Sequence, residues 1–200
     1  MDDLLNYSLK QDPLISFQDW YEAAMLVEQN AQAMAVSTYD QELNRPSSRY
    51  LLFKGVKDTK IIFYTNYLSP KGIELNDNPE IALTFYWHVS KKQVRIHGKV
   101  TKMSREESTI YFQSRDRDSQ IASYLSKQSK VIEDKQALLL KFNKTRDLFA
   151  GKPIPLPEMW GGYLVEPYEY EFFLYGENRL NDRFLYKINN KKWEVSRLQP

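Results

Sequence analysis

The chain of 200 residues carries 28 lysines and arginines against 26 aspartates and glutamates, so no global charge favours nucleic acid or an anionic membrane as a partner. Its apolar share of 42% is enough to bury a full core, and we expect one domain over residues 1–200. The absence of cysteine excludes disulfides and thiolate chemistry. The two histidines, His88 and His97, leave little for a metal centre, so we expect no metal.

The N-terminal part, residues 1–31, is predicted to be a tail followed by a helix. It begins with acidic residues where a secretory signal needs basic ones, and no apolar run in the chain reaches membrane-spanning length. A cytoplasmic protein without a membrane segment is therefore expected. Apolar residues at helical spacing predict the helix over residues 15–29. A strand over residues 32–38 and a polar connection over residues 39–48 are expected next.

Two apolar runs follow, at residues 49–54 and 60–66, on either side of the short polar turn 55–59. Apolar runs of this length joined by a short turn are typical of two strands that pair with each other. The sequence therefore predicts a β-hairpin here.

A helix start after the hairpin puts a lysine in an unusual position. Ser69 is a good N-cap and Pro70 suits the first helical position, so a short helix is predicted to run to residue 76. Lys71 then lies in the first turn, where the helix dipole opposes a cation unless an anion such as phosphate is bound there. With Arg49 and Lys54 the segment offers three cations, enough for one or two phosphates. The alternative is three solvated surface cations.

The rest of the chain alternates between strands and helices. Alternating apolar residues predict strands at 81–88 and 93–103, and a capping box from Ser104 to Glu107 opens a helical insertion of about residues 104–150. We expect an α+β fold that is mainly antiparallel β, a barrel with a helical insertion. The remaining predicted elements are helices over 105–114, up to 125 and over 131–150, and strands over 160–165, 168–175, 184–188 and 193–198.

Residues 111–129, YFQSRDRDSQIASYLSKQS, interleave cations with hydroxyls and amides. These are the donors that a phosphate monoester needs. Arg115 and Ser119 lie four residues apart and would share one face of a continuous helix. Asp116 and Asp118 could equally neutralise the arginines in local pairs and leave a solvated corner, and spacing alone does not choose between the two.

Several long runs together resemble the pyridoxamine 5′-phosphate oxidase family. They are R-x-x-x-x-K at 49–54, YTN at 64–66, SRDRDSQIASYLSKQS, PLPEMWGGY, and the ending from ENRLNDRFLY to RLQP. The match is collinear and covers nearly the whole chain. The resemblance implies an FMN-binding split β-barrel and a homodimer with both active sites at its interface. It also implies oxidation of pyridoxamine or pyridoxine 5′-phosphate to pyridoxal 5′-phosphate by O₂, with release of H₂O₂.

The same resemblance implies roles for individual residues. Arg179 and Asn181 would be catalytic residues at the substrate, with Arg179 over the reacting face, where a hydride passes from C4′ to flavin N5. The substrate phosphate would be bound by Lys54, Tyr111, Arg115 and Ser119. Contacts to FMN would be made by Arg49, Tyr64, Thr65, Lys71, Gln93, Gln128, Ser129, Phe173 and Arg183.

Three positions depart from the family pattern. Pro70 stands where a basic residue is usual, Phe173 where a tryptophan is usual, and Asn181 where a histidine is usual. An amide can hydrogen-bond to a substrate but does not titrate near neutral pH, so we expect activity with an altered rate or substrate preference.

Two other functions stay open. One is a split-barrel protein that binds FMN or pyridoxal 5′-phosphate without turnover, as a carrier or sensor. The other is an RNA-binding barrel, which the balanced charge and the lack of an aromatic RNA-recognition motif disfavour.

Overall fold

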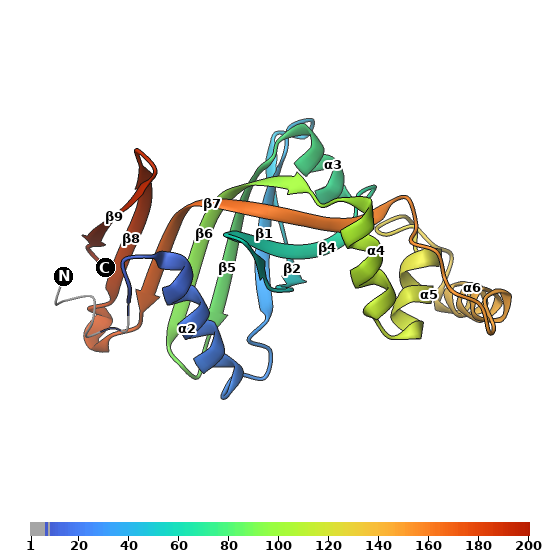
Figure 1. Ribbon diagram of the computed structural model, residues 1–200, viewed down its shortest axis with the longest axis horizontal. Coiled ribbons are helices and arrows are strands. Elements are labelled where there is room, and N and C mark those ends of the chain that lie inside the picture. The colour runs from blue at the N-terminus through green and yellow to red at the C-terminus, as the bar shows by residue number, and fades with distance from the viewer. Residues whose placement is uncertain (1–6, 8) are drawn as a thin grey trace.

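The computed structural model describes Tyr7 and residues 9–200. Within this part of the chain, nine strands form one antiparallel sheet that curls into an open barrel (Figure 1). The predicted α+β class with a mainly antiparallel sheet is confirmed. The strands are β1 (Ala33–Asp40), β2 (Arg45–Leu52), β3 (Val56–Lys57), β4 (Lys60–Asn66), β5 (Glu80–Trp87), β6 (Lys92–Lys102), β7 (Trp160–Leu174), β8 (Asp182–Asn189) and β9 (Lys192–Leu198).

Five α-helices and one short 3₁₀ helix are found in the described residues, with the insertion helices at one end of the barrel (Figure 1). No helix of the described part is long and apolar enough to cross a membrane. The helices are α2 (Pro13–Met25), α3 (Pro70–Asp77), α4 (Arg105–Ser114), α5 (Arg117–Leu125), α6 (Lys135–Leu148) and η1 (Glu177–Arg179).

The strand order is β2-β1-β5-β6-β7-β4-β3, with β8 paired to β7 and β9 to β8. The two halves of the long strand β7 pair with different strands. Residues 160–165 pair with β4, and residues 169–174 pair with β8. Because of this division, β4 and β8 lie beside different halves of the same strand.

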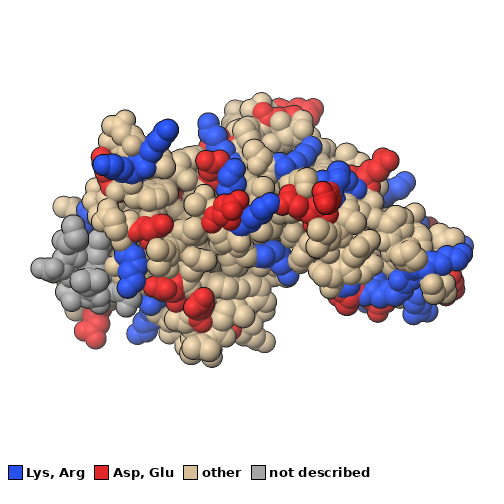
Figure 2. Space-filling model, in the orientation of Figure 1, with Lys and Arg blue, Asp and Glu red and all other residues tan. Residues whose placement is uncertain are grey.

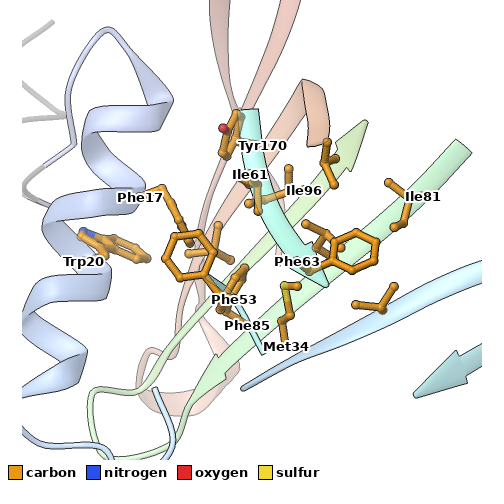
Figure 3. Close-up of a cluster of buried hydrophobic side chains, with 14 of the residues drawn as sticks. Phe17, Trp20, Met34, Phe53, Ile61, Phe63, Ile81, Phe85, Ile96 and Tyr170 are labelled. Atoms are coloured by element: carbon orange, nitrogen blue, oxygen red, sulfur yellow. The ribbon is translucent and has the colours of Figure 1, made fainter. Parts of the chain in front are cut away.

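The helix α2 covers the core because its apolar face meets aromatic residues of the sheet. Asp12 caps the helix by accepting a hydrogen bond from the Leu14 backbone at 2.9 Å. Phe17 and Trp20 are fully buried and point into the cluster shown in Figure 3. Phe17 packs edge-on against Phe53 with ring centroids 5.4 Å apart. The helix ends at Met25, four residues before the predicted end.

The predicted hairpin of residues 49–54 with 60–66 forms only next to its turn, where the backbones of Lys54 and Gly55 hydrogen-bond to Ile62, and the rest of the predicted pairing is wrong. β2 pairs with β1 from Ala33 opposite Leu52 to Asp40 opposite Arg45, while β4 pairs with β7 and the two-residue strand β3. The predicted connection 39–48 is therefore largely strand. β2 is an edge strand with exposed polar residues and a proline. Such a segment lacks the apolar alternation by which a strand is recognised in a sequence. The partner of β4 lies about a hundred residues further along, which no local pattern reveals.

The helical insertion has a small core of its own, formed by Phe112, Ile121, Ile154 and Trp160. Its helices begin where the sequence predicts caps: the Ser104 hydroxyl accepts from the Glu107 backbone at 3.2 Å, so the predicted capping box is confirmed. α6 begins at residue 135 rather than 131, after an aspartate cap. The insertion is therefore fixed against the start of β7, where Trp160 lies.

Candidate active site

A cavity of about 590 Å³ lies between the barrel and the insertion helices α4 and α5. Predicted site residues from both sides of it meet here, although they are up to 74 residues apart in the chain, from Lys54 to Gln128. All four residues predicted to bind the substrate phosphate line the cavity, and three of those predicted to contact FMN also do. They are Lys54, Tyr111, Arg115 and Ser119 in the first group, and Tyr64, Thr65 and Gln128 in the second.

One wall of the cavity is a stack of parallel aromatic rings. Tyr64 and Tyr111 have centroids 3.8 Å apart, and Trp160 lies 5.3 Å from Tyr64 with its plane within 11°. Burial raises the pKa of Tyr64 to about 12, so its phenol stays neutral at physiological pH. A flat, neutral wall of this kind suits a flat aromatic ligand.

Arg115 is held in place at the edge of this wall. Its Nη1 donates to the Ser123 hydroxyl at 2.7 Å, and its guanidinium lies 4.9 Å from the centre of the Trp160 ring. Asp116 instead accepts from the Ser119 backbone at 2.8 Å and caps α5. Among the ion pairs of the described residues none joins Arg115 or Arg117 to an aspartate, although the charge of Asp116 still acts on Arg115. The charge of Arg115 is available to the cavity.

A charged cluster of Arg49, Lys71 and Glu74 lies beside the cavity. α3 starts at Pro70 with Ser69 as its N-cap, as the sequence predicts, and this puts Lys71 in the first turn with only 7% of its surface exposed. Lys71 Nζ donates to the Ser69 hydroxyl and to Gln128 Oε1, each at 3.0 Å. Burial, followed by the nearby charge of Arg49, lowers the pKa of Lys71 to about 8.

Gln128 joins the charged cluster to the cavity. Its Oε1 accepts from Lys71 and also from the Thr65 hydroxyl at 3.5 Å. Ser129 follows it with φ at +68° and lines a neighbouring hollow instead of the cavity. Hydrogen bonds through Gln128 therefore connect Lys71 and Thr65, two of the residues predicted to contact FMN.

The remaining predicted residues form a C-terminal group: Gln93, Phe173, Arg179, Asn181 and Arg183. Strand pairing puts Phe173 opposite Gln93 on one side and opposite Arg183 on the other. The Arg183 guanidinium lies 5.7 Å from the Phe173 ring. Asn181 Oδ1 accepts from the Gly176 backbone at 3.1 Å, and Arg179 is exposed in a left-handed conformation with φ at +63°.

The C-terminal group is far from the cavity within one chain. Tyr64, at the cavity, pairs with Gly162 near the start of β7, and Phe173 lies eleven residues further along that strand. At about 3.3 Å per residue this is roughly 35 Å along the strand. One chain therefore does not bring the two sets of residues together around a small ligand.

Two buried carboxylates were missed by the sequence reasoning. Glu74 and Glu171 are each 6% exposed, and both accept from arginines. Glu171 lies 3.0 Å from Arg95 and 2.7 Å from Arg183. No sequence signal marks them, because glutamate on a helix or a strand is usually exposed and the partners are distant in the chain. Within the described residues, no group of three or more potential ligands could hold a metal ion.

Comparisons with known proteins identify the family. Residues 22–149 match the model described as pyridoxamine 5′-phosphate oxidase, and residues 160–200 match the pyridoxine 5′-phosphate oxidase C-terminal dimerisation region. The chain belongs to the pyridoxamine 5′-phosphate oxidase family. This is a family of oxidoreductases, so the enzyme class expected from the sequence is confirmed.

Relatives of the oxidase family match over almost the full length. The chain is 43% identical to the pyridoxine/pyridoxamine 5′-phosphate oxidase of Psychromonas ingrahamii, over 98% of this chain and 91% of the relative. It is 39% identical to that of Coxiella burnetii, over 98% of this chain and 100% of the relative.

Solved structures agree on the fold of this oxidase family member. PhzG from Burkholderia lata, in complex with tetrahydrophenazine-1-carboxylic acid, is 28% identical with a TM-score of 0.89, over 96% of this chain and 94% of that one. A pyridoxamine 5′-phosphate oxidase-related, FMN-binding protein from Nostoc punctiforme is 17% identical with a TM-score of 0.77, over 94% and 98%. The predicted split-barrel fold is therefore confirmed.

Proposed function

We propose that this chain oxidises pyridoxamine 5′-phosphate and pyridoxine 5′-phosphate to pyridoxal 5′-phosphate, with FMN as cofactor and O₂ as electron acceptor, giving H₂O₂. The observation that supports the proposal is two separate pairs of cations beside one cavity, to each of which we assign one phosphate. One pair is Arg49 and Lys71 and the other is Lys54 and Arg115. A reaction between two phosphorylated aromatic molecules needs this arrangement.

The chemistry of the charged cluster fits the phosphate of FMN. Lys71 is a buried ammonium whose hydrogen-bond partners, Ser69 and Gln128, are neutral, and it belongs to no ion pair within the described residues. A buried cation is stabilised by an anion, and the start of α3 adds backbone N–H groups. Arg49 and Lys71 would hold the phosphate, with Tyr64, Thr65, Gln128 and Ser129 along the rest of FMN. When bound, FMN supplies the two-electron redox chemistry that no amino-acid side chain supplies.

The cavity residues suit the phosphate ester of vitamin B6. Lys54 and Arg115 supply two cations, and Tyr111 and Ser119 supply two hydroxyls. Arg115 is already fixed by Ser123 and Trp160, so little conformational entropy is lost when it binds a phosphate. The role of these residues is to anchor the substrate, so that its pyridine ring is oriented for the reaction.

We infer that each active site is shared between two copies of the chain in a homodimer. The C-terminal group lies roughly 35 Å from the cavity along β7, and it belongs to the segment that matches a dimerisation region. A partner copy would bring its Gln93, Phe173 and Arg183 to FMN, and its Arg179 and Asn181 to the substrate. Asn181 would position the substrate by hydrogen bonds without moving a proton. The cytoplasm is the expected compartment.

The face of the molecule drawn in Figure 2 gives no support to the RNA-binding alternative. Figure 2 shows acidic and basic side chains interspersed over the visible face. A nucleic-acid groove needs a continuous basic stripe, usually with exposed aromatic residues for stacking.

The activity is tested by adding pyridoxamine 5′-phosphate to the purified yellow protein without oxygen. We expect the flavin absorbance to bleach and, when air is admitted, one pyridoxal 5′-phosphate and one H₂O₂ to form per cycle. Bound flavin that neither phosphate ester bleaches would contradict oxidase activity and favour the non-catalytic binding protein.

Arg115→Ala tests the substrate receptor. Loss of a charge-assisted contact should raise KM about 30-fold to 100-fold and leave FMN affinity within about threefold. Arg117→Ala is the matched control, because Arg117 donates to the backbone of Phe149 and Lys152 and does not line the cavity. An equal rise of KM in both variants would contradict the assignment of Arg115.

A further inference from the structure

Glu74 lies inside the cluster of charges that the proposed function assigns to the flavin phosphate. It follows Lys71 by three residues on α3, which packs against β1 (Figure 1), so both side chains lie on the same side of the helix. Only 6% of its surface is exposed. Its Oε2 lies 3.1 Å from Arg49 Nη2 and also accepts from the Thr38 hydroxyl. The cluster therefore contains two cations and one buried anion.

The chain's own acceptors occupy both terminal nitrogens of Arg49. Nη1 donates to the Thr38 hydroxyl and, at 3.4 Å, to the Val36 carbonyl. Nη2 donates to the Ser47 hydroxyl and to Glu74. Glu74 is the charged member of these four acceptors, so it alone among them adds the attraction of an opposite charge to the hydrogen bond from the guanidinium. A phosphate that binds Arg49 must therefore compete with the Glu74 carboxylate for the hydrogen bonds of the guanidinium.

We propose that Glu74 is an internal counter-ion that competes with the flavin phosphate for Arg49 and thereby limits how tightly FMN binds. The inference rests on the proposed function, because it takes the charged cluster as the phosphate site. In the ligand-free protein Glu74 neutralises a partly buried guanidinium, which stabilises the fold. In the bound protein the same carboxylate lies near the phosphate and repels it, offsetting part of the attraction of Arg49 and Lys71.

The test removes the charge of Glu74 and keeps its shape. Glu74→Gln retains an oxygen that can accept from Thr38 and Arg49. Ligand-free wild-type and variant proteins are titrated with FMN and with riboflavin, which lacks the phosphate, and binding is followed by quenching of flavin fluorescence. We expect the Kd for FMN to fall about tenfold in the variant. The Kd for riboflavin should change by less than about twofold.

Glu166→Gln is the matched control, because it makes the same change in net charge at an exposed glutamate paired with Lys60. It should leave the Kd for FMN within about twofold of wild type. An FMN affinity of Glu74→Gln that equals or is weaker than that of wild type overturns the proposal, and so does an equal gain in riboflavin affinity.

A second variant covers the case in which Glu74→Gln does not fold. Glu74→Asp keeps the charge and draws it back from Arg49 by one methylene, so the Kd for FMN should fall about threefold. No fall overturns the proposal. Wild-type protein that binds neither FMN nor riboflavin would overturn the proposed function together with this inference. Wild-type protein that binds FMN, with variants that bind it no more tightly, would overturn the inference alone.

Discussion

Replacing Lys71 with methionine should stabilise the ligand-free protein and weaken its binding of FMN. The ammonium is buried against neutral partners, and its pKa falls from the ordinary 10.5 to about 8. A difference of about 2.5 between these pKa values corresponds to about 3 kcal/mol of destabilisation at pH 7. Methionine removes this penalty but also loses the hydrogen bonds to Ser69 and Gln128, at about 1 kcal/mol each. The net gain expected is about 1 kcal/mol.

The pH dependence gives the prediction its specific signature. Between pH 8 and 10.5 the unfolded chain keeps the proton that folded Lys71 has lost. The unfolded state therefore binds more protons, and the free energy of unfolding of the wild type rises with pH across this window. The methionine variant has no such group, so its advantage should shrink from pH 8 upward and disappear near pH 9, and at pH 10 the wild type should be the more stable by about 1 kcal/mol.

The assay is urea unfolding of both ligand-free proteins at one fixed protein concentration, at pH 7 and at pH 10. Lys144→Met is the matched control on an exposed face of α6 and should change stability by less than about 0.5 kcal/mol. FMN titration of the Lys71 variant should show a Kd at least about 30-fold higher. A variant that is less stable than wild type at pH 7, or whose difference does not depend on pH, would refute the reasoning.

Two further substitutions probe the packing around the site. A methyl group added by Gly72→Ala would lie 2.3 Å from the Tyr67 carbonyl oxygen. Because backbone must move, urea unfolding should show a loss of about 2–3 kcal/mol, and a neutral result would mean that α3 adjusts freely. Glu171→Ala removes the carboxylate that binds Arg183 and a second arginine, which should cost about 2–3 kcal/mol and raise the Kd for FMN. Unchanged unfolding and FMN affinity would show that Arg183 needs no such support.

The local parts of the fold were predictable from the sequence. Local signals identify the starts of α4, where the Ser104 side chain caps the helix, and of α3, where Pro70 follows Ser69 although Ser69 makes no side-chain capping bond, and alternation identifies β5 and β6. Strand pairing was not predictable in the same way. The proximity of β4 to residues 49–54 in the chain suggested a hairpin along both runs, but β4 pairs with the preceding segment only as far as Ile62 and with β7 from Ile61 to Asn66. Partners this distant leave no local signal.

The same holds for the site: residues close together in the sequence were predictable, and contacts between distant segments were not. The cavity residues of α4 and α5 form one continuous sequence run, so their gathering around Arg115 agrees with the donor pattern read from it. Glu74 could not be predicted, because it lies on α3 and its charged partner Arg49 comes from the strand β2, 25 residues earlier in the chain. The family resemblance implied active sites at a dimer interface, but no local pattern showed that the C-terminal group, which includes Phe173, is the part that lies far from the cavity within one chain.

The shared active site is tested most directly by mixing two defective subunits. Arg115→Ala impairs the cavity and Arg179→Ala impairs the C-terminal group, so each homodimer should be nearly inactive when the substrate concentration is kept well below the wild-type KM. Heterodimers carrying one subunit of each kind are purified through two different tags. They contain one site with both substitutions and one with neither, so they should recover about half of the wild-type activity. Heterodimers no more active than the parent homodimers would contradict an active site built from two chains.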